Sequence, residues 1–164
     1  MSAWTAGLAW IEASPLGEAL RSYGVWTYGV TNLVHIIGIA TLFGSILILD
    51  LRLLGVRSST PIPIVASLTA PLAVAGFCLA VLSGICLLAV NGSEYATNPF
   101  LPIKFSAIAL GLINAFVLHR TKAWRAIRAG NDGVPKSLQL RAMGGVSLAC
   151  WLTAIGAGRM IGYW

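Results

Sequence analysis

The sequence predicts an all-α protein, a four-transmembrane-helix bundle with an N-terminal amphipathic interfacial helix and both termini outside. Three observations support this fold class. The composition is 57% hydrophobic and only 10% charged, whereas soluble domains are nearer about one quarter charged. Four long stretches are apolar enough to cross a bilayer. Lys and Arg gather in the loops after the first and third of these stretches. An ordinary soluble enzyme, a disordered tail and a disulfide-rich secreted module are thereby excluded.

Residues 1–22 predict an amphipathic helix that lies in the membrane interface. Their apolar residues recur near helical spacing, with Glu12 and Glu18 between them. Ser14-Pro15 is typical of an N-cap followed by a proline at the first helical position. We therefore expect this segment to be broken at Ser14.

Four spans complete a single membrane domain of residues 1–164. The first stretch carries no formal charge from Ser22 to Leu49, and the second carries none from Ser58 to Ser93. Pro71 fits the first helical position of the second span, although an earlier start with a kink at Pro71 is equally allowed. Asn91–Pro99 is rich in turn-forming residues and predicts a loop. The spans are expected at about residues 24–49, 71–90, 100–119 and 142–163.

The distribution of cations predicts how the chain is threaded. Arg52 and Arg57 follow the first span, and the connection 120–141 after the third span is strongly basic. The positive-inside rule places both loops in the cytoplasm and both termini in the periplasm of a bacterial inner membrane. We interpret the basic connection as a topology signal, with anionic lipid headgroups as its alternative partner. No nucleic-acid partner is expected, because no RNA- or DNA-binding motif accompanies the charge.

His35 is the candidate ligand of a cofactor. It lies roughly 15 Å below the outer boundary, at about 1.5 Å per helical residue. Asn32, Gly38 and Ser45 share its face, and such a polar, small-residue stripe is typical of helix contacts. We expect Gly38 to leave room for a flat ligand. The alternatives are a histidine hydrogen-bonded within the bundle, an axial ligand of haem iron, and a copper ligand.

Lys104 and Arg159 are two cations near the outer face. One interpretation is that both side chains extend to the lipid headgroups. The other is that they bind anionic groups of a cofactor, such as haem propionates, which would reach them from an iron at His35.

Four further residues are ionisable or metal-ligating. His119 lies about 20 Å deeper than His35 by helix rise, so one iron cannot bind both; it is an interfacial histidine, a ligand at a second site, or a proton-transfer group. Cys78 lies near the depth of His35 and is either a buried small side chain or a second metal ligand. Asp50 and Arg52 are expected to pair with the basic loop and to fix the helix depth.

The segments WIEASPLGEALRSYGVW, NLVHIIGIATLFGSILILDLRLLG, YATNPFLPIKF and WLTAIGAGRMIGY resemble a bacterial family of uncharacterised integral membrane proteins, over nearly the whole chain. More remotely, the first-span histidine with Lys104 and His119 is similar to membrane proteins of the copper-resistance D type. It is also similar to the four-helix protoporphyrinogen oxidase of bacteria, a haem-binding protein. The resemblance implies a four-helix fold and a functional core of His35, Lys104 and His119.

Three functional hypotheses follow. The first is a cofactor protein that binds b-type haem (heme b) for electron transfer or tetrapyrrole redox chemistry, with His35 as axial ligand and Lys104 and Arg159 as anion clamps. The second is a non-catalytic accessory subunit of a larger complex, or a homo-oligomer. The third is copper handling by His35 and Cys78. The small-residue faces that suit helix contacts with a partner are Gly38/Ser45, Gly111/Ala115 and Gly144/Gly145/Gly158.

Overall fold

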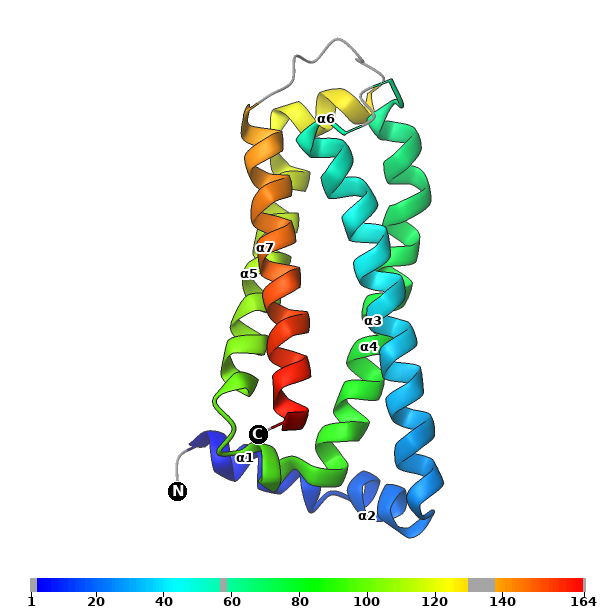
Figure 1. Ribbon diagram of the computed structural model, residues 1–164, viewed down its shortest axis with the longest axis vertical. Helices are drawn as coiled ribbons and strands as arrows, with labels where there is room; N and C mark the ends of the chain where they lie inside the picture. Colours follow the sequence, from blue (N-terminus) through cyan, green and yellow to red (C-terminus); the bar gives the residue numbers. More distant parts are fainter. Residues whose placement is uncertain (1–2, 57–58, 130–137, 164) are drawn as a thin grey trace.

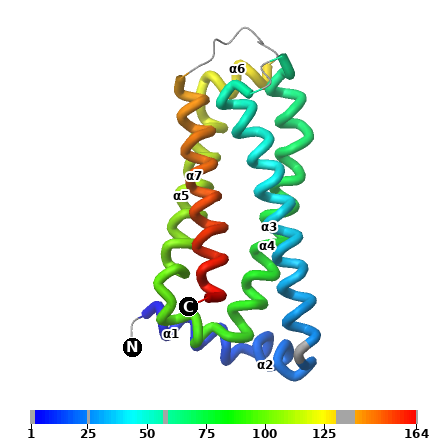
Figure 2. The backbone as a smooth tube through the Cα atoms, viewed as in Figure 1, coloured from blue at the N-terminus to red at the C-terminus, as the bar shows by residue number. Residues whose placement is uncertain are grey.

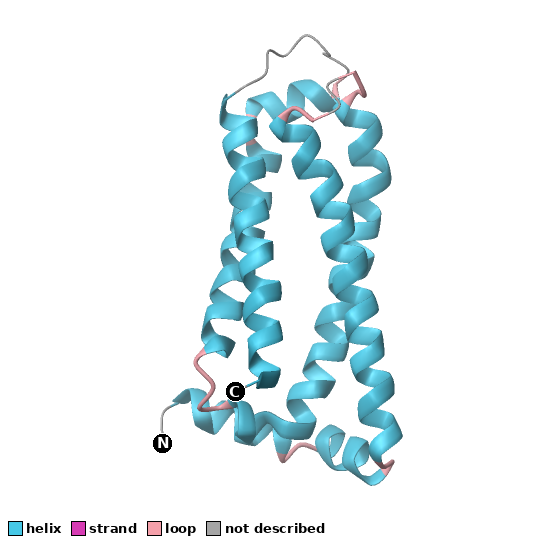
Figure 3. Cartoon of the chain, viewed as in Figure 1, coloured by secondary structure: helices cyan, strands magenta, loops and turns pink. Residues whose placement is uncertain are grey.

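The computed structural model describes residues 3–56, 59–129 and 138–163, and this part of the chain contains helices and no strand (Figures 1 and 3). Arg57 and Lys136 of the two basic loops lie outside the described residues. The all-α prediction is confirmed. The helices are α1 (Ala3–Glu12), α2 (Pro15–Ser22), α3 (Val25–Leu54), α4 (Ile62–Tyr95), α5 (Phe100–Arg120), α6 (Lys122–Arg128), α7 (Leu138–Met160) and the 3-10 turn η1 (Ile161–Tyr163).

The four long helices α3, α4, α5 and α7 run along the long axis of the molecule (Figures 1 and 2). Each is long and apolar enough to cross a membrane, so the chain is a multi-pass membrane protein. Helix α3 packs along α4, α5 packs along α7, and α3 also contacts α7. The short helices α1 and α2 lie across the end that carries both termini, and α6 lies across the opposite end.

The N-terminal segment is broken where the sequence predicts. Ser14 is the N-cap of α2, its hydroxyl accepts a hydrogen bond from the Gly17 N–H at 3.3 Å, and Pro15 is the first helical residue. The two short helices therefore change direction at Ser14 because the capping chemistry favours a new start there.

Helix α4 is longer than the span of residues 71–90. It begins at Ile62 and passes through Pro71, which is exposed. Its one departure from helical backbone angles is at Asn91, with φ −135° and ψ 36°. The helix then continues to Tyr95, so the loop expected over 91–99 is largely helical. Packing of α1 on this segment overrides its turn propensity, since a Cβ on Gly92 would lie 2.8 Å from the Leu8 carbonyl oxygen.

The basic connection after α5 contains a helix that the sequence analysis missed. Trp124 and Ile127 of α6 are buried, while Lys122, Arg125 and Arg128 are exposed. The i, i+3 spacing of the two apolar side chains was the available signal. They close this end of the bundle in an apolar group, here called the end cluster, of Leu53, Leu118, Trp124, Ile127 and Leu140.

Helices α3 and α4 cross with their backbones in contact. A Cβ added to Gly38 would lie 2.7 Å from the Ala80 nitrogen, and one added to Gly76 would lie 2.5 Å from the Leu42 nitrogen. Both distances are too short for any side chain, so glycine is required on both helices. The expected space for a flat ligand beside Gly38 is therefore absent, because the backbone of α4 fills it.

We expect Gly38→Ala and Gly76→Ala each to destabilise the folded protein by about 1–3 kcal/mol, because the added methyl group must push two backbones apart. Gly44→Ala is the matched control on α3, since a Cβ there meets nothing within 4 Å. Alanine has a higher helix propensity than glycine at all three positions. The three variants are therefore expected to differ only in how the added methyl group packs against the neighbouring helix. Unfolding in detergent, by heat or by SDS titration, measures the difference, and equal stability of the Gly38 and Gly44 variants would contradict the crossing.

The N-terminal helices hold the kink of α4. In an unbroken helix the Ser93 N–H and the Ala89 carbonyl would be hydrogen-bond partners. Here the Ser93 N–H donates to Glu12 Oε2 at 2.6 Å, and Arg21 Nη1 donates to the Ala89 oxygen at 3.0 Å. Arg21 Nη2 also donates to the Glu12 carbonyl at 3.0 Å. Glu12 and Arg21 thus supply partners to backbone groups on both sides of Asn91 and fix α1 and α2 to α4.

Docking of α1 on α4 is expected to weaken in acid. The hydrogen bonds with Ser93 hold the pKa of Glu12 below its usual value and outweigh the opposing effect of burial, while a weaker attraction to Arg21 also lowers the pKa. A lowered folded-state pKa means that this stabilisation is present above the usual glutamate pKa and is lost as the pH falls through the lowered value.

Hydrogen exchange of α1 and of the Ser93 amide, corrected for intrinsic rates, measures this effect. Protection is expected to fall in the native chain as the pH drops below the usual glutamate pKa. Glu12→Gln should show lower protection at neutral pH and little change with acid, while Glu18→Gln, at an exposed position, should behave as the native chain does. A pH dependence that survives in Glu12→Gln would contradict this assignment.

Candidate functional site

His35 lies against α4 rather than pointing out at lipid. Its Nδ1 is 3.0 Å from the hydroxyl oxygen of Ser83, and the ring is half-buried. A Cβ on Gly84 would lie 3.1 Å from the His35 Cε1, so the small residue provides the surface on which the ring rests. His35, Gly38 and Leu42 share one face of α3, and this face meets α4 at the crossing. The close approach of the two helices therefore brings the imidazole to the hydroxyl.

The hydrogen bonds of Ser83 assign the tautomer of His35. A serine hydroxyl has one proton, and Ser83 is buried with its Oγ donating to the Leu79 carbonyl at 2.6 Å. The hydroxyl therefore accepts from His35, whose proton is on Nδ1. The lone pair is then on Nε2, which is the state in which histidine binds metals while its other nitrogen holds the ring in place. The sequence analysis missed Ser83, although small residues at helical spacing on α4 were a signal for this face.

Lys104 is the cation that the structure brings near His35. It is half-buried on α5, and its side chain lies over Gly158 of α7. A Cβ added to Gly158 would lie 3.5 Å from the Lys104 Nζ. The charge of the ammonium acts electrostatically on the imidazole, and no hydrogen bond joins the two side chains in the described part of the chain. A glycine at position 158 lets the lysine lie inside the bundle, where an anionic group could bind it.

Arg159 has a different position from Lys104. Its guanidinium is exposed, donates to the Tyr163 hydroxyl and lies 4.6 Å from the centre of the Tyr163 ring. The two predicted clamps therefore share one end of the bundle, one in its interior and one on its surface.

His119 lies at the other end of α5. The separation from Lys104 is 15 residues, about 22 Å along the helix. Its Nδ1 is 2.7 Å from the Ala115 carbonyl oxygen, and its exposed ring meets the Trp124 ring edge-on at 5.3 Å. His119 thus belongs to the α6 end and not to the surroundings of His35.

Cys78 is not brought to His35. It is exposed, and it lies two residues from both Gly76 and Ala80, which face α3. A two-residue step turns about 200° around a helix, so the thiol lies on the opposite side of α4. Among the described residues, no group of three or more His, Cys, Asp or Glu side chains could hold a metal ion.

The small-residue faces are used within the chain. The space beside Gly38 is filled by α4, Trp151 lies 3.3 Å from a Cβ on Gly111, and the Asp50 carbonyl lies 3.1 Å from one on Gly144. Asn114 adds a hydrogen bond from α5 to the Met143 carbonyl of α7 at 3.0 Å. At these three glycines the faces pack within the chain, and a partner subunit stays a prediction.

Asp50 is buried and does not pair with the basic loop in the described part of the chain. Helix α3 continues to Leu54, so Asp50 lies more than one turn inside it, against α7. Its side chain is hydrogen-bonded to Ser147. Arg52, on another face, donates from Nε to the Thr60 carbonyl. Among the described residues the predicted pairing of Asp50 is not formed, because the helix ends later than the sequence indicated and buries the side chain.

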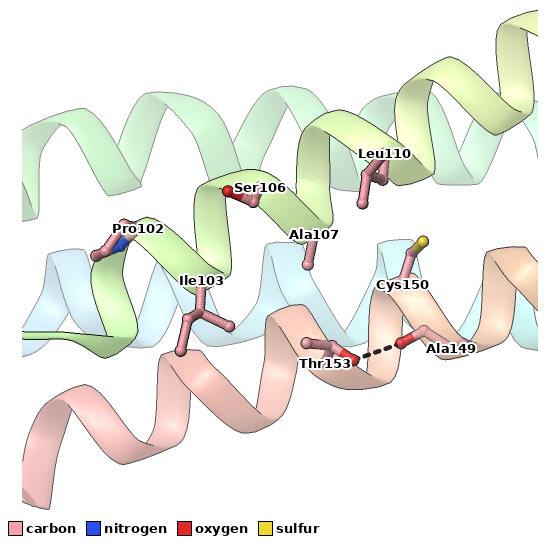
Figure 4. A pocket seen from close by; sticks show the side chains of 8 residues that line it. All are labelled: Pro102, Ile103, Ser106, Ala107, Leu110, Ala149, Cys150 and Thr153. Carbon is pink, nitrogen blue, oxygen red and sulfur yellow. Dashed lines mark hydrogen bonds between the residues drawn. The ribbon is translucent and has the colours of Figure 1, made fainter.

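An open groove between α5 and α7 is a separate feature (Figure 4). Its polar groups are few, and the Thr153 hydroxyl already donates to the Ala149 carbonyl at 2.8 Å. Neither His35 nor Lys104 contributes to it, so it offers no chemistry to the candidate site. The groove is lined by Pro102, Ile103, Ser106, Ala107, Leu110, Ala149, Cys150 and Thr153.

Comparison with known proteins gives a family without an activity. The model of a family described as "Family of unknown function (DUF6644)" matches residues 7–164. No curated protein and no solved structure matches the chain. The remote similarity to the copper-resistance D type and to four-helix protoporphyrinogen oxidase stays a prediction.

Proposed function

This chain belongs to the DUF6644 family, and we propose from its own residues that it is a small membrane-embedded protein that binds b-type haem through His35. Its role would be electron transfer or tetrapyrrole redox chemistry. The observation that carries the proposal is the 3.0 Å hydrogen bond between His35 Nδ1 and the Ser83 hydroxyl. Because that hydroxyl donates to the Leu79 carbonyl, we assign the imidazole proton to Nδ1 and the lone pair to Nε2.

By number of protein ligands, His35 suits a haem better than a bare metal ion. Because α4 fills the space beside Gly38, the haem would have to lie on another side of the imidazole. One imidazole is too few ligands for copper, whose protein sites combine several, and Cys78 lies on the far side of α4. A haem supplies four nitrogens of its own and needs only axial ligands from the protein. Lys104, in the interior near His35, would hold an anionic propionate. When bound, haem supplies a one-electron couple at its iron.

Ser83 would act through His35. By holding Nδ1–H, its hydroxyl orients the ring and increases the basicity of Nε2. Because Ser83 is 5% exposed and also bonded to the backbone of α4, this partner is fixed in place before any ligand binds.

The expected outcome is a haem absorption band that depends on His35. Protein purified in detergent from haem-replete cells should show a Soret band, and His35→Ala should abolish it. Ser83→Ala should keep the ligand and lower haem affinity by about 10–100-fold, the usual effect of removing such a supporting hydrogen bond.

His119→Ala is the matched control, since the sequence has two histidines and the second lies at the α6 end. Its spectrum should equal that of the native chain. A colourless native preparation, or a Soret band unchanged in His35→Ala, would overturn the proposal.

We also infer the orientation of the bundle in a bacterial inner membrane. Six cations belong to the α6 end in the described part of the chain, namely Arg52, Arg120, Lys122, Arg125, Arg128 and Arg141. The end with the termini carries Arg21, Lys104 and Arg159. The positive-inside rule then supports a cytoplasmic α6 and periplasmic termini.

Reporter fusions test this orientation. Green fluorescent protein should fluoresce when fused after residue 129 and stay dark at the C-terminus, whereas alkaline phosphatase should be active only at the C-terminus. The opposite result at both positions would reverse the assignment. The unfused chain, followed in the same membranes by immunoblot, controls for expression.

A further inference from the structure

Asp50 is a carboxyl group enclosed within the bundle, and the haem proposal makes no use of it. Its residue is 4% exposed, although the helix that carries it spans the membrane. The backbone of α7 approaches closely, with a Cβ on Gly144 falling 3.1 Å from the Asp50 carbonyl oxygen. Ser147, one turn further along α7, is the side-chain hydrogen-bond partner of the carboxyl group. Its Oδ2 has no hydrogen-bond partner among the described residues.

No described cation pairs with this carboxyl group. On α3 itself, Arg52 donates to the Thr60 carbonyl, and Arg141 of α7 is exposed. Helix α4 carries no charged residue from Ile62 to Ser93. The ionisable groups of α5 and α6 near this end are all exposed, namely His119, Arg120, Lys122, Arg125 and Arg128. A carboxylate buried in this way without a counter-ion is costly.

The end cluster separates Asp50 from the α6 surface. Leu53 lies three residues beyond Asp50 on α3, and Leu140 lies four residues before Gly144 on α7. Both belong to the cluster that Trp124 and Ile127 close. Asp50 therefore has a hydroxyl on one side and apolar packing toward the end of the bundle.

We propose that Asp50 and Ser147 form a proton-binding site inside the membrane domain. The Asp50 carboxylate takes up one proton on Oδ2 to give the neutral acid, while its other oxygen keeps the hydrogen bond of Ser147. A proton suits this site better than a metal cation, because Na⁺, K⁺ or Ca²⁺ would need about six oxygen ligands. The described polar groups here amount to one carboxyl and one hydroxyl.

Infrared spectroscopy of the full chain in lipid nanodiscs tests the proposal. Spectra taken from about pH 5 to about pH 9 should contain a C=O stretch of a neutral carboxylic acid that is lost as the pH rises. Asp50→Asn, which keeps the shape and a carbonyl oxygen, should abolish that band. Ser147→Ala should keep it but move it to higher frequency, because hydrogen bonding lowers a carbonyl stretch.

Labelling with dicyclohexylcarbodiimide gives a second measurement on the native chain. This apolar reagent adds to protonated carboxyl groups, so peptide mass spectrometry should find at least about 10-fold more label on Asp50, which is enclosed in the bundle, than on exposed Glu18. Glu18→Gln is the matched control and should leave the infrared band unchanged.

Three results would overturn the proposal. One is a set of spectra in which Asp50→Asn, with its thermal unfolding unchanged, equals the native chain at every pH. The second is an infrared C=O band whose frequency does not change in Ser147→Ala. This result decides the question even if Asp50→Asn fails to fold. The third is a shift to lower pH of the point at which the band is lost, when Na⁺ or K⁺ replaces choline at constant ionic strength. Such a shift would show that the site binds a metal cation. None of these readouts depends on haem.

Discussion

The backbone contact of α3 and α4 at Gly38 and Gly76 is the constraint on which the rest of the bundle depends. With no Cβ on either residue, the helices approach until backbone atoms touch. One turn from this crossing, the same approach brings His35 to within 3.0 Å of Ser83. Dispersion and polar contacts hold helices together in a bilayer, where apolar burial gives little driving force. The contact that builds the helix pair is therefore also the contact that orients the imidazole.

The two ends of the bundle are closed by different chemistry. At the end with the termini, the side chains of Glu12 and Arg21 form hydrogen bonds with two backbone groups of α4, the Ser93 N–H and the Ala89 carbonyl. The kink at Asn91 separates these two groups from each other. At the other end, Trp124 and Ile127 of α6 close the bundle with apolar surface. Unsatisfied backbone groups are not tolerated in contact with lipid, so the kinked end needs polar partners while the other end needs only packing.

Long apolar stretches and cation spacing were enough to predict the four spans, because a bilayer imposes length and composition directly. The helix start at Ser14 and Pro15 could also be predicted, because capping depends on residues that are adjacent in the chain. The sequence did not show which helix packs against a given glycine. Gly38 looked like room for a ligand, yet α4 fills that space. Asp50 looked like a helix end, yet one more turn of α3 buries it against Ser147. Both errors come from contacts between segments far apart in the chain, which no local pattern encodes.

The positions of His35 and Asp50 on one helix decide how independent their roles are. Fifteen residues separate them, so they lie about 22 Å apart along α3. At that distance and an effective dielectric constant of about 20, two unit charges interact by roughly 0.8 kcal/mol. That energy corresponds to about a fourfold change in a binding constant. A proton at Asp50 would therefore modulate the proposed haem site at His35 only weakly by direct electrostatics. Stronger coupling would have to pass through a rearrangement of the α3–α4 crossing, and the two glycines there leave little room for the helices to approach further. The histidine and the carboxyl group are thus best understood as two separate sites that share one rigid helix.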